Sequence, residues 1–147
     1  MDIDKLRKEL EIDEGRVDAI YLDHLGYPTF GIGHLITSDD PEHGSPVDTA
    51  VTSVRVVEAF EEDVQAVCDD CRILLPDFDE LPGEAQLVIA NMMFNMGRTR
   101  LSKFKKFIGA VHIEDWMEAS AQMKDSRWYN QVTKRAQRLR DRIEALA

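Results

Sequence analysis

One segment near the beginning of the chain constrains the fold more than any other. Between residues 17 and 34, β-branched and aromatic residues such as Ile20, Tyr21 and Phe30 are punctuated by glycine and proline. This composition is typical of short strands joined by tight turns. No other part of the sequence has it, so the chain predicts one small β-containing region in a protein that is otherwise helical.

Most of the remaining sequence has apolar residues at three- and four-residue steps, which is the pattern of amphipathic helices. The longest pattern predicts a helix over 53–73, and a second, largely buried helix is predicted over 82–96. Residues 37–52 hold two prolines and many polar turn residues, so they predict a loop. Shorter helices are predicted before Gly15, over 101–108, over 113–123, and through Ala136, Leu139 and Ile143. The predicted fold class is therefore α+β and predominantly α.

The composition of the 147 residues, 44% hydrophobic and 31% charged, fits one compact domain with its own core. The most apolar stretch, residues 87–94, is far shorter than the roughly 18–20 residues that span a bilayer. No stable membrane insertion is therefore expected. The first residues are acidic where a secretory signal has a basic patch, so we expect synthesis in the cytoplasm without a signal peptide.

Two cysteines, Cys68 and Cys71, have the CxxC spacing of redox and zinc sites. A redox pair usually opens a helix, and a closed zinc site needs four ligands, whereas this pair falls inside the helix predicted over 53–73. Gly31 and Gly33 lack the third glycine of a nucleotide-binding loop, so they indicate room for a close strand turn. Buried packing of the cysteines is favoured over a redox or metal-responsive role, and no cofactor or metal is expected.

Charge is unevenly distributed along the sequence. Residues 1–97 contain 6 basic and 22 acidic residues, whereas residues 98–147 contain 12 basic and 6 acidic residues, within a net charge of −10. A basic last third can steer a polyanion such as nucleic acid, an anionic membrane or a bacterial wall polymer. A solvated helix surface explains the same pattern, and the sequence leaves both interpretations open.

Glu14 and Asp23 are candidates for acid–base chemistry, because Glu14 precedes the β segment and Asp23 lies at the tip of its first predicted turn. Cleavage of a glycosidic bond needs one protonated carboxyl group to assist the leaving oxygen and one ionised carboxylate to activate water or attack the sugar. A glutamate and an aspartate on different elements suit this division. Spacing alone is not specific, because the chain has 28 acidic residues.

Three separated motifs make the hypothesis specific. They are the segment from Asp13-Glu14-Gly15 through Ile20-Tyr21-Leu22-Asp23 to Gly31-Ile32-Gly33-His34-Leu35, the segment Asn91–Gly97, and Ser126–Gln131 followed by Arg135-Ala136. Together they closely resemble the phage-type lysozyme family, the endolysin muramidases of tailed bacteriophages, over nearly the whole chain. The resemblance implies a two-lobed lysozyme fold in a single domain, residues 1–147. Its parts are a β-containing lobe at 14–52, a connecting helix at 53–73, and a helical lobe from 1–13 and 74–147, with substrate in the cleft between lobes.

The resemblance also implies a reaction and the residues that perform it. Glu14 matches the family's general acid, Asp23 its second carboxylate, and Thr29 the residue that helps Asp23 to position a water molecule. The implied reaction is an inverting hydrolysis of the β-1,4 bond from N-acetylmuramic acid to N-acetylglucosamine in peptidoglycan. It needs no metal and no cofactor.

Further positions match supporting residues of the family. His34 and Asp63 match an ion pair between the β lobe and the long helix, which would raise the pKa of His34 in the folded state. Arg135 matches a residue that approaches the catalytic glutamate, with a plain surface arginine as the alternative. Such a cation favours ionised Glu14, whereas burial favours its protonated form.

Expected substrate contacts lie in both lobes. For Leu35 and Phe94, both packing and substrate contact stay open as interpretations. Asn95 follows Phe94 in the matching motif. Gln122 and Phe107 stand where the family has an Asn and a Ser, and the loop 37–52 is shorter than in comparable members. Glycan preference is therefore where we expect this chain to differ. Trp128 is expected to be a core anchor rather than a sugar-stacking residue.

The partner implied by the resemblance is bacterial peptidoglycan, and no nucleic acid partner is expected. We expect a monomer that is made in a host bacterial cytoplasm and reaches the wall by holin-type release or on a virion. The main alternative is a non-catalytic module with the same fold that binds wall glycan or a protein partner. The joint presence of Glu14, Asp23 and Thr29 favours the enzyme, because a binding module needs none of them for catalysis.

Overall fold

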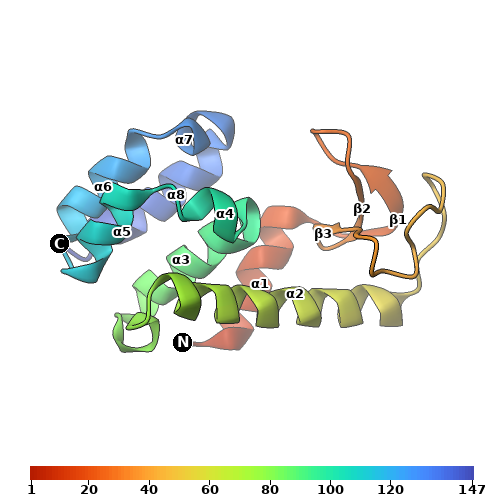
Figure 1. The fold of residues 1–147 in the computed structure, drawn as a ribbon, viewed down its shortest axis with the longest axis horizontal. Helices are drawn as coiled ribbons and strands as arrows, with labels where there is room; N and C mark the ends of the chain where they lie inside the picture. Colours follow the sequence, from red (N-terminus) through yellow and green to blue (C-terminus); the bar gives the residue numbers. More distant parts are fainter. The chain divides into compact units, whose positions relative to one another are not determined.

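A computed structural model describes all residues 1–147 and shows a predominantly helical chain with one small antiparallel sheet (Figure 1). The predicted α+β class is therefore confirmed. In chain order the elements are α1 (Ile3–Glu14), β1 (Val17–Leu22), β2 (Pro28–Gly31), β3 (His34–Leu35), α2 (Ser53–Leu74), the 3-10 helix η1 (Phe78–Glu80), α3 (Gly83–Met96), α4 (Arg98–Leu101), α5 (Lys105–His112), α6 (Trp116–Lys124), α7 (Arg127–Gln131) and α8 (Thr133–Glu144).

The chain divides into two compact units. One, called the β unit here, contains Arg7–Ala66, and the other, called the helical unit, contains Met1–Leu6 and Val67–Ala147. The boundaries fall inside α1 and α2, so each unit includes part of both helices. The expected single domain, with a β-containing lobe at 14–52, a connecting helix at 53–73 and a helical lobe from 1–13 and 74–147, stays a prediction.

The sheet of the β unit has the strand order β1-β2-β3, and both strand pairs are antiparallel. Tyr21 lies opposite Thr29, and Thr29 lies opposite Leu35, so one row of residues crosses all three strands. The pairing of β1 with β2 is irregular between Val17 and Tyr21, where a bridge from Ala19 to Ala50 joins the loop 37–52 to the sheet. This loop therefore packs as part of the β unit.

Apolar side chains fill the space between the sheet and the two helices of the β unit. Ile20 and Phe30 are almost completely buried from the sheet side, and Val56 and Ala59 are buried from α2. Arg7 of α1 donates to both carboxylate oxygens of Glu61 on α2 at 2.7 and 2.8 Å. The two helices are thus joined by a bidentate ion pair beside an apolar core.

The helical unit is built around α3. Ten of its fourteen residues are buried, and a helix that is apolar on every side needs neighbours all round. The neighbours in the helical unit include α4 and α8, and α6 packs against both α5 and α8. No helix in the structure combines the length with the apolar character that crossing a membrane requires.

The two long predicted helices match α2 and α3 to within a residue at each end, but the prediction for 101–108 was wrong. The chain forms two helices there, because the hydroxyl of Ser102 donates to the carbonyl of Thr99 and Phe104 leaves the helical conformation. The helix predicted over 113–123 begins later, since the carboxylate of Asp115 accepts the N–H of Glu118 and caps α6. The short helix α7 was not predicted.

Candidate active site

Glu14 is the last residue of α1, and the chain turns away after it. Gly15 has φ +71° and donates its N–H to the carbonyl of Glu11, which ends the helix in the left-handed conformation that glycine adopts without strain. The side chain of Glu14 is half-buried. The helix end therefore projects a carboxyl group that is only partly open to solvent.

The turn between β2 and β3 is shaped to receive this carboxyl group. Gly33 has φ +66°, and a Cβ atom at this position would lie 2.8 Å from Oε2 of Glu14. A carbon and an oxygen do not approach that closely without displacement of one of them. Gly33 is thus a glycine for two reasons, its backbone conformation and the approach of Glu14, and the close turn inferred from sequence has this carboxylate against it.

Asp23 follows β1 and organises the next turn. Its Oδ1 accepts the N–H groups of Leu25 and Tyr27, both at 2.9 Å, and its own N–H donates to the carbonyl of Tyr27 at 2.9 Å. A carboxylate held by two backbone donors has a defined orientation. Oδ2 accepts neither of these bonds, which leaves one oxygen of a fixed carboxylate for other contacts.

Thr29 is connected to Asp23 through one residue. Its hydroxyl donates to the carbonyl of Tyr27 at 3.0 Å, and its side chain is 4% exposed. Tyr27 therefore holds the Asp23 carboxylate through its N–H and the Thr29 hydroxyl through its C=O. Because the Thr29 hydroxyl donates to a carbonyl, its lone pairs remain able to accept from a water molecule.

Tyr21 is a residue that the sequence reasoning did not assign to the site. It lies directly opposite Thr29 across the β1–β2 pair and precedes Asp23 by two residues, which places the three side chains on one face of the hairpin. Burial and the negative charges of Glu14 and Asp23 raise the pKa of the Tyr21 phenol. Its place two residues before Asp23 is the sequence signal that could have identified it. Tyr21 thus lies opposite Thr29 and close enough to Glu14 and Asp23 for their charges to act on its phenol.

A second cluster of ionisable groups surrounds His34. Its Nδ1 lies 2.7 Å from Oδ2 of Asp63, as expected from the resemblance, and its Nε2 lies 2.9 Å from Oδ2 of Asp40, which was not expected. Burial lowers the pKa of His34, but hydrogen bonds and charges from both carboxylates outweigh burial and raise this pKa above its ordinary value. Both ring nitrogens donate when the ring is protonated, so the arrangement suits an imidazolium.

Arg55 of α2 extends this cluster into the loop 37–52. It forms ion pairs with Asp40 at 3.1 Å, with Glu42 at 2.8 Å and with Glu58 at 2.8 Å. Burial raises the pKa of Asp40, but the N–H of Thr37, His34 and Arg55 together lower it. The loop is therefore attached to α2 by charge as well as by packing.

Of the five residues expected to contact substrate, four are exposed or half-buried and one is buried. Leu35 on β3 is 49% exposed, and Phe94 on α3 and Gln122 on α6 are half-buried, with Gln122 donating to Glu118 at 2.8 Å. Asn95 accepts the indole N–H of Trp128 at 2.7 Å. Phe107 is 1% exposed, so the expectation of a substrate contact there is corrected: its side chain belongs to the core of the helical unit.

Three other expectations concern single side chains. Trp128 is 2% exposed, which makes it the core anchor that its sequence context predicts. Arg135 donates from Nε to Oδ1 of Asn91 at 2.8 Å, so α8 and α3 are joined at this point. Cys68 and Cys71 form no disulfide and are buried, and burial together with the neighbouring Cys68 raises the pKa of Cys71. Such a thiol is a poor nucleophile and a poor ligand, and no group of three or more His, Cys, Asp or Glu side chains is placed to hold a metal ion.

Comparison with known proteins gives this geometry its context. The model of the phage lysozyme family matches residues 11–145. Probable T4-type lysozyme 2 of Dictyostelium discoideum is 28% identical over an alignment that covers 93% of this chain and 92% of that protein. The pre-baseplate central spike protein Gp5 of Enterobacteria phage T4 is 30% identical over 88% of this chain, which corresponds to 26% of that protein.

A third relative is the peptidoglycan hydrolase gp36 of Pseudomonas phage phiKMV, which is 29% identical over 92% of this chain and 15% of its own length. The alignments with the T4 and phiKMV proteins thus match a part of larger proteins, whereas the Dictyostelium alignment spans nearly all of both chains. Because the family model covers almost the whole chain, this protein belongs to the phage lysozyme family and is a lysozyme-type glycoside hydrolase.

Proposed function

We propose that the chain hydrolyses the β-1,4 bond between N-acetylmuramic acid and N-acetylglucosamine in bacterial peptidoglycan, with inversion at the anomeric carbon. The printed name of the phiKMV relative, a peptidoglycan hydrolase, supports this substrate. The observation that carries the proposal is the shared attachment of Asp23 and Thr29 to Tyr27, on the hairpin face where Tyr21 experiences the charges of Glu14 and Asp23.

In the proposed reaction Glu14 acts as the general acid. Its protonated carboxyl group donates a proton to the glycosidic oxygen while the bond from that oxygen to the anomeric carbon breaks. The carboxyl group projects from the end of α1 beside Gly33, where a Cβ atom would lie 2.8 Å from its Oε2. This confined position supports the role, because a general acid must lie within hydrogen-bond reach of the leaving oxygen.

Asp23 and Thr29 take the water in the same proposal. The free oxygen of Asp23 and the Thr29 hydroxyl accept from one water molecule, whose oxygen bonds to the anomeric carbon from the side opposite the leaving group. The water's proton passes to Asp23. An inverting enzyme needs about 6.5–9.5 Å between its carboxyl groups to admit this water, and the origin of the two groups on a helix end and a hairpin turn is compatible with such a separation.

Tyr21 is assigned a positioning role in this scheme. Its phenol is protonated at neutral pH, as for an ordinary tyrosine, and its raised pKa keeps it so at higher pH. It therefore serves as a neutral hydrogen-bond donor beside two carboxyl groups. A neutral donor steadies an ionised carboxylate without adding charge to the site.

Delivery to the wall, by holin-type release or on a virion particle, completes the proposal, and the T4 spike relative supports the particle as the first route to examine.

Release of reducing ends from purified peptidoglycan tests the proposed function. Wild type is compared with Glu14→Gln and with Glu11→Gln, which removes an exposed carboxylate one turn earlier on α1. Loss of a general acid lowers the rate by about 10²–10⁴-fold, so Glu14→Gln should be nearly inactive and Glu11→Gln should retain activity. Product anomers read by NMR give the stereochemistry, and a folded wild type that releases nothing would leave the non-catalytic binding module as the function.

A further inference from the structure

The cations of the chain differ in whether they have an acidic partner. Arginines in the first part of the chain are ion-paired, for example Arg7 with Glu61 and Arg72 with Asp79. Five exposed cations between residues 103 and 127 form no ion pair, and neither do Lys5 and Lys8 of α1. The five are Lys103, Lys105, Lys106, Lys124 and Arg127. A sixth exposed cation, Arg100, donates to the neutral Gln131 at 2.9 Å.

The fold of the helical unit collects these six residues. Helices α5 and α6 pack against each other and are joined by residues 113–115 alone, and two helices with so short a connection run antiparallel. The start of α5, with Lys105 and Lys106, therefore lies beside the end of α6, with Lys124. Arg127 begins α7 directly after α6, and the bond from Arg100 attaches α4 to the end of α7.

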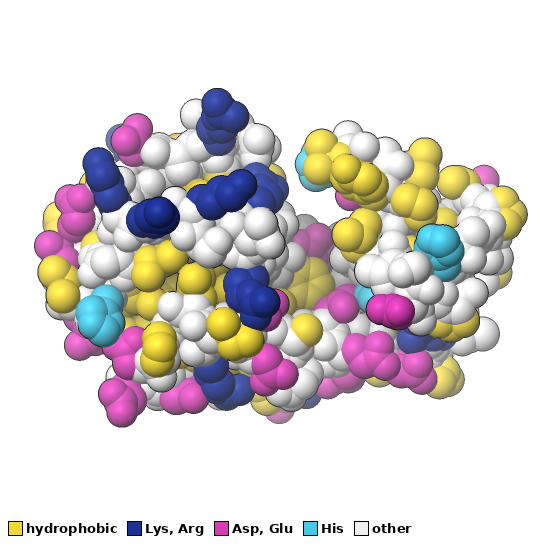
Figure 2. All heavy atoms as spheres, viewed as in Figure 1, with side chains coloured by type: hydrophobic (Ala, Val, Ile, Leu, Met, Phe, Trp, Pro, Cys, Tyr) yellow, Lys and Arg dark blue, Asp and Glu magenta, His cyan; other side chains and the backbone are white.

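We call this set the cationic face, defined by Arg100, Lys103, Lys105, Lys106, Lys124 and Arg127. Figure 2 shows lysine and arginine side chains spread over the visible side of the helical unit, with acidic side chains mainly along its left and lower edges. Asp125 is the one acidic residue of the segment 119–131. The face therefore keeps a strong positive charge inside a chain whose net charge is −10.

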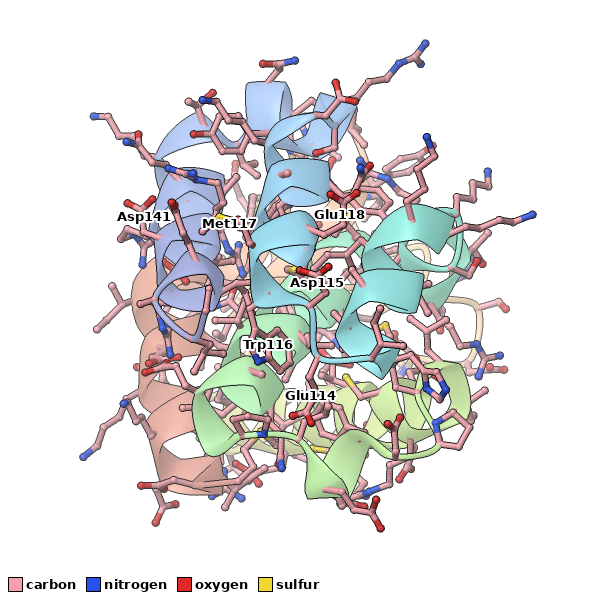
Figure 3. The ribbon with its side chains drawn as sticks, turned by 90° about the vertical axis from the view of Figure 1, so that its left-hand side faces the viewer. Glu114, Asp115, Trp116, Met117, Glu118 and Asp141 are labelled. Atoms are coloured by element: carbon pink, nitrogen blue, oxygen red, sulfur yellow. The ribbon has the colours of Figure 1, made fainter.

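Acidic residues gather at the other end of the α5–α6 hairpin. Glu114, Asp115 and Glu118 lie along the connection and the first turn of α6 (Figure 3). Asp115 caps α6 and Glu118 accepts from Gln122. Opposite charges thus occupy opposite ends of one hairpin, which gives a docking polyanion a single attractive end.

The side chains around the cationic face indicate which polyanion fits. The only exposed large apolar residues after residue 97 are Ile113 and Met117, and both belong to the acidic end. Insertion into a membrane needs apolar side chains that enter the lipid, and binding of single-stranded nucleic acid by base stacking needs exposed aromatic rings. The cationic face has neither, so it suits a hydrated chain of phosphate groups that is bound by charge alone.

We propose that the cationic face binds a polyol-phosphate polymer of the class that many bacteria attach covalently to peptidoglycan. Lysine ammonium groups contact phosphates as mobile point charges without reading a sequence. The binding rests on the proposed function in one respect, namely that the polymer lies on the same wall as the glycan substrate. It keeps the enzyme on the wall between cleavages by raising its local concentration there.

The test uses the full chain carrying Glu14→Gln, so that the wall is not digested during binding. Sedimentation with purified walls is compared before and after chemical removal of the polyol-phosphate polymer, across a salt series. The face variant is Lys105→Glu with Lys106→Glu. The matched control is Lys5→Glu with Lys8→Glu, which changes the net charge equally at two exposed lysines of α1.

We expect the Glu14→Gln chain to prefer polymer-bearing walls by at least tenfold, with affinity that falls steeply as salt increases. The face variant should lose most of this preference, and the control should keep it. Equal binding to stripped walls, or equal losses in both variants, would overturn the proposal. Tighter binding to anionic lipid vesicles or to DNA than to the free polymer would overturn it as well.

Activity distinguishes this proposal from the proposed function. Cleavage of polymer-free glycan chains is measured for the otherwise wild-type face variant, which should match wild type because the altered lysines lie outside the candidate site. If glycan is cleaved but the polymer is not preferred, the cationic-face proposal alone fails. If the polymer is preferred but no glycan is cleaved, the proposed function alone fails.

Discussion

In the β unit the buried polar residues are Thr29 and His34, and both join turns or loops that carry ionisable groups. In the helical unit they are Gln86, Asn91 and Ser120, and their partners are backbone carbonyls or a neighbouring helix. The β unit thus uses buried polar groups to orient charges, whereas the helical unit uses them to fasten helices. Substitutions in the first should change activity or the pH dependence of stability, and substitutions in the second should change stability without changing activity.

After Glu14→Gln, the largest effect on activity is expected at Gly33. In Gly33→Ala the new Cβ displaces the flexible end of Glu14, so activity should fall by about 10²–10³-fold. The matched control is Gly44→Ala, since Gly44 also has positive φ but a Cβ there meets nothing within 4 Å. Both variants should lose about 1–2 kcal/mol of stability from backbone strain, measured by urea unfolding. Equal activity in the two variants would show that Gly33 has no special relation to Glu14.

The next effect is a loss of stability without a loss of function. Ile89 on α3 is completely buried, so Ile89→Ala should lower the free energy of unfolding by about 2–5 kcal/mol through cavity formation. Activity per folded molecule should stay near that of wild type at low temperature. Ile113→Ala is the control, because Ile113 is 72% exposed and its loss should cost less than about 0.5 kcal/mol. A large activity loss in folded Ile89→Ala would contradict the division between the units.

A third prediction concerns the pH dependence of the His34 cluster. The raised pKa of His34 stabilises the fold fully below the unfolded value of about 6.5, and this contribution is lost as pH rises through the folded pKa. The lowered pKa of Asp40 stabilises the fold above its unfolded value of about 3.9, and that contribution is lost as pH falls through the folded pKa. His34→Asn should therefore cost most between these two values, by about 1.5–3 kcal/mol.

Urea unfolding of wild type and His34→Asn from pH 4 to pH 9 measures this difference directly. His24→Asn, at an exposed histidine in the Asp23 turn, is the control and should cost less than about 0.5 kcal/mol at any pH. NMR titration of His34 should give a pKa above about 6.5. A stability difference that stays constant from pH 4 to pH 9 would contradict the link between ionisation of His34 and Asp40 and the stability of the fold.

The smallest effect is expected at Tyr21. Tyr21→Phe removes one neutral donor beside the two carboxyl groups, so kcat should fall about 2–10-fold, which corresponds to about 0.5–1.5 kcal/mol. The pH profile of kcat should shift while KM stays unchanged, because the phenol is assigned to the carboxylates rather than to the sugar. Tyr129→Phe, at a half-buried tyrosine of the helical unit, should alter neither. An unchanged pH profile in Tyr21→Phe would reduce Tyr21 to a packing residue.

The sequence predicted long elements better than their contacts. Helices α2 and α3 were predictable because apolar periodicity repeats over many residues. The break between α4 and α5 occurs at Phe104, whose backbone leaves the helical conformation, and periodicity does not encode this.

The site shows the same limit. The approach of Asp63 to His34 came from a family resemblance, but the contact with Asp40 depends on how the loop 37–52 folds back on α2. Burial of Phe107 likewise depends on the packing of α5, which an alignment position does not give. Contacts made by loops and short helices are set by three-dimensional paths, so local sequence patterns do not specify them.

The way in which Tyr27 holds Asp23 and Thr29 offers an opportunity for labelling. Its main-chain N–H and C=O make both bonds, while its side chain is 55% exposed. The native thiols of Cys68 and Cys71 are buried, so Tyr27→Cys would introduce the one accessible thiol of the chain. A fluorophore attached there would report glycan arrival beside the two carboxyl groups without altering the bonds that orient them.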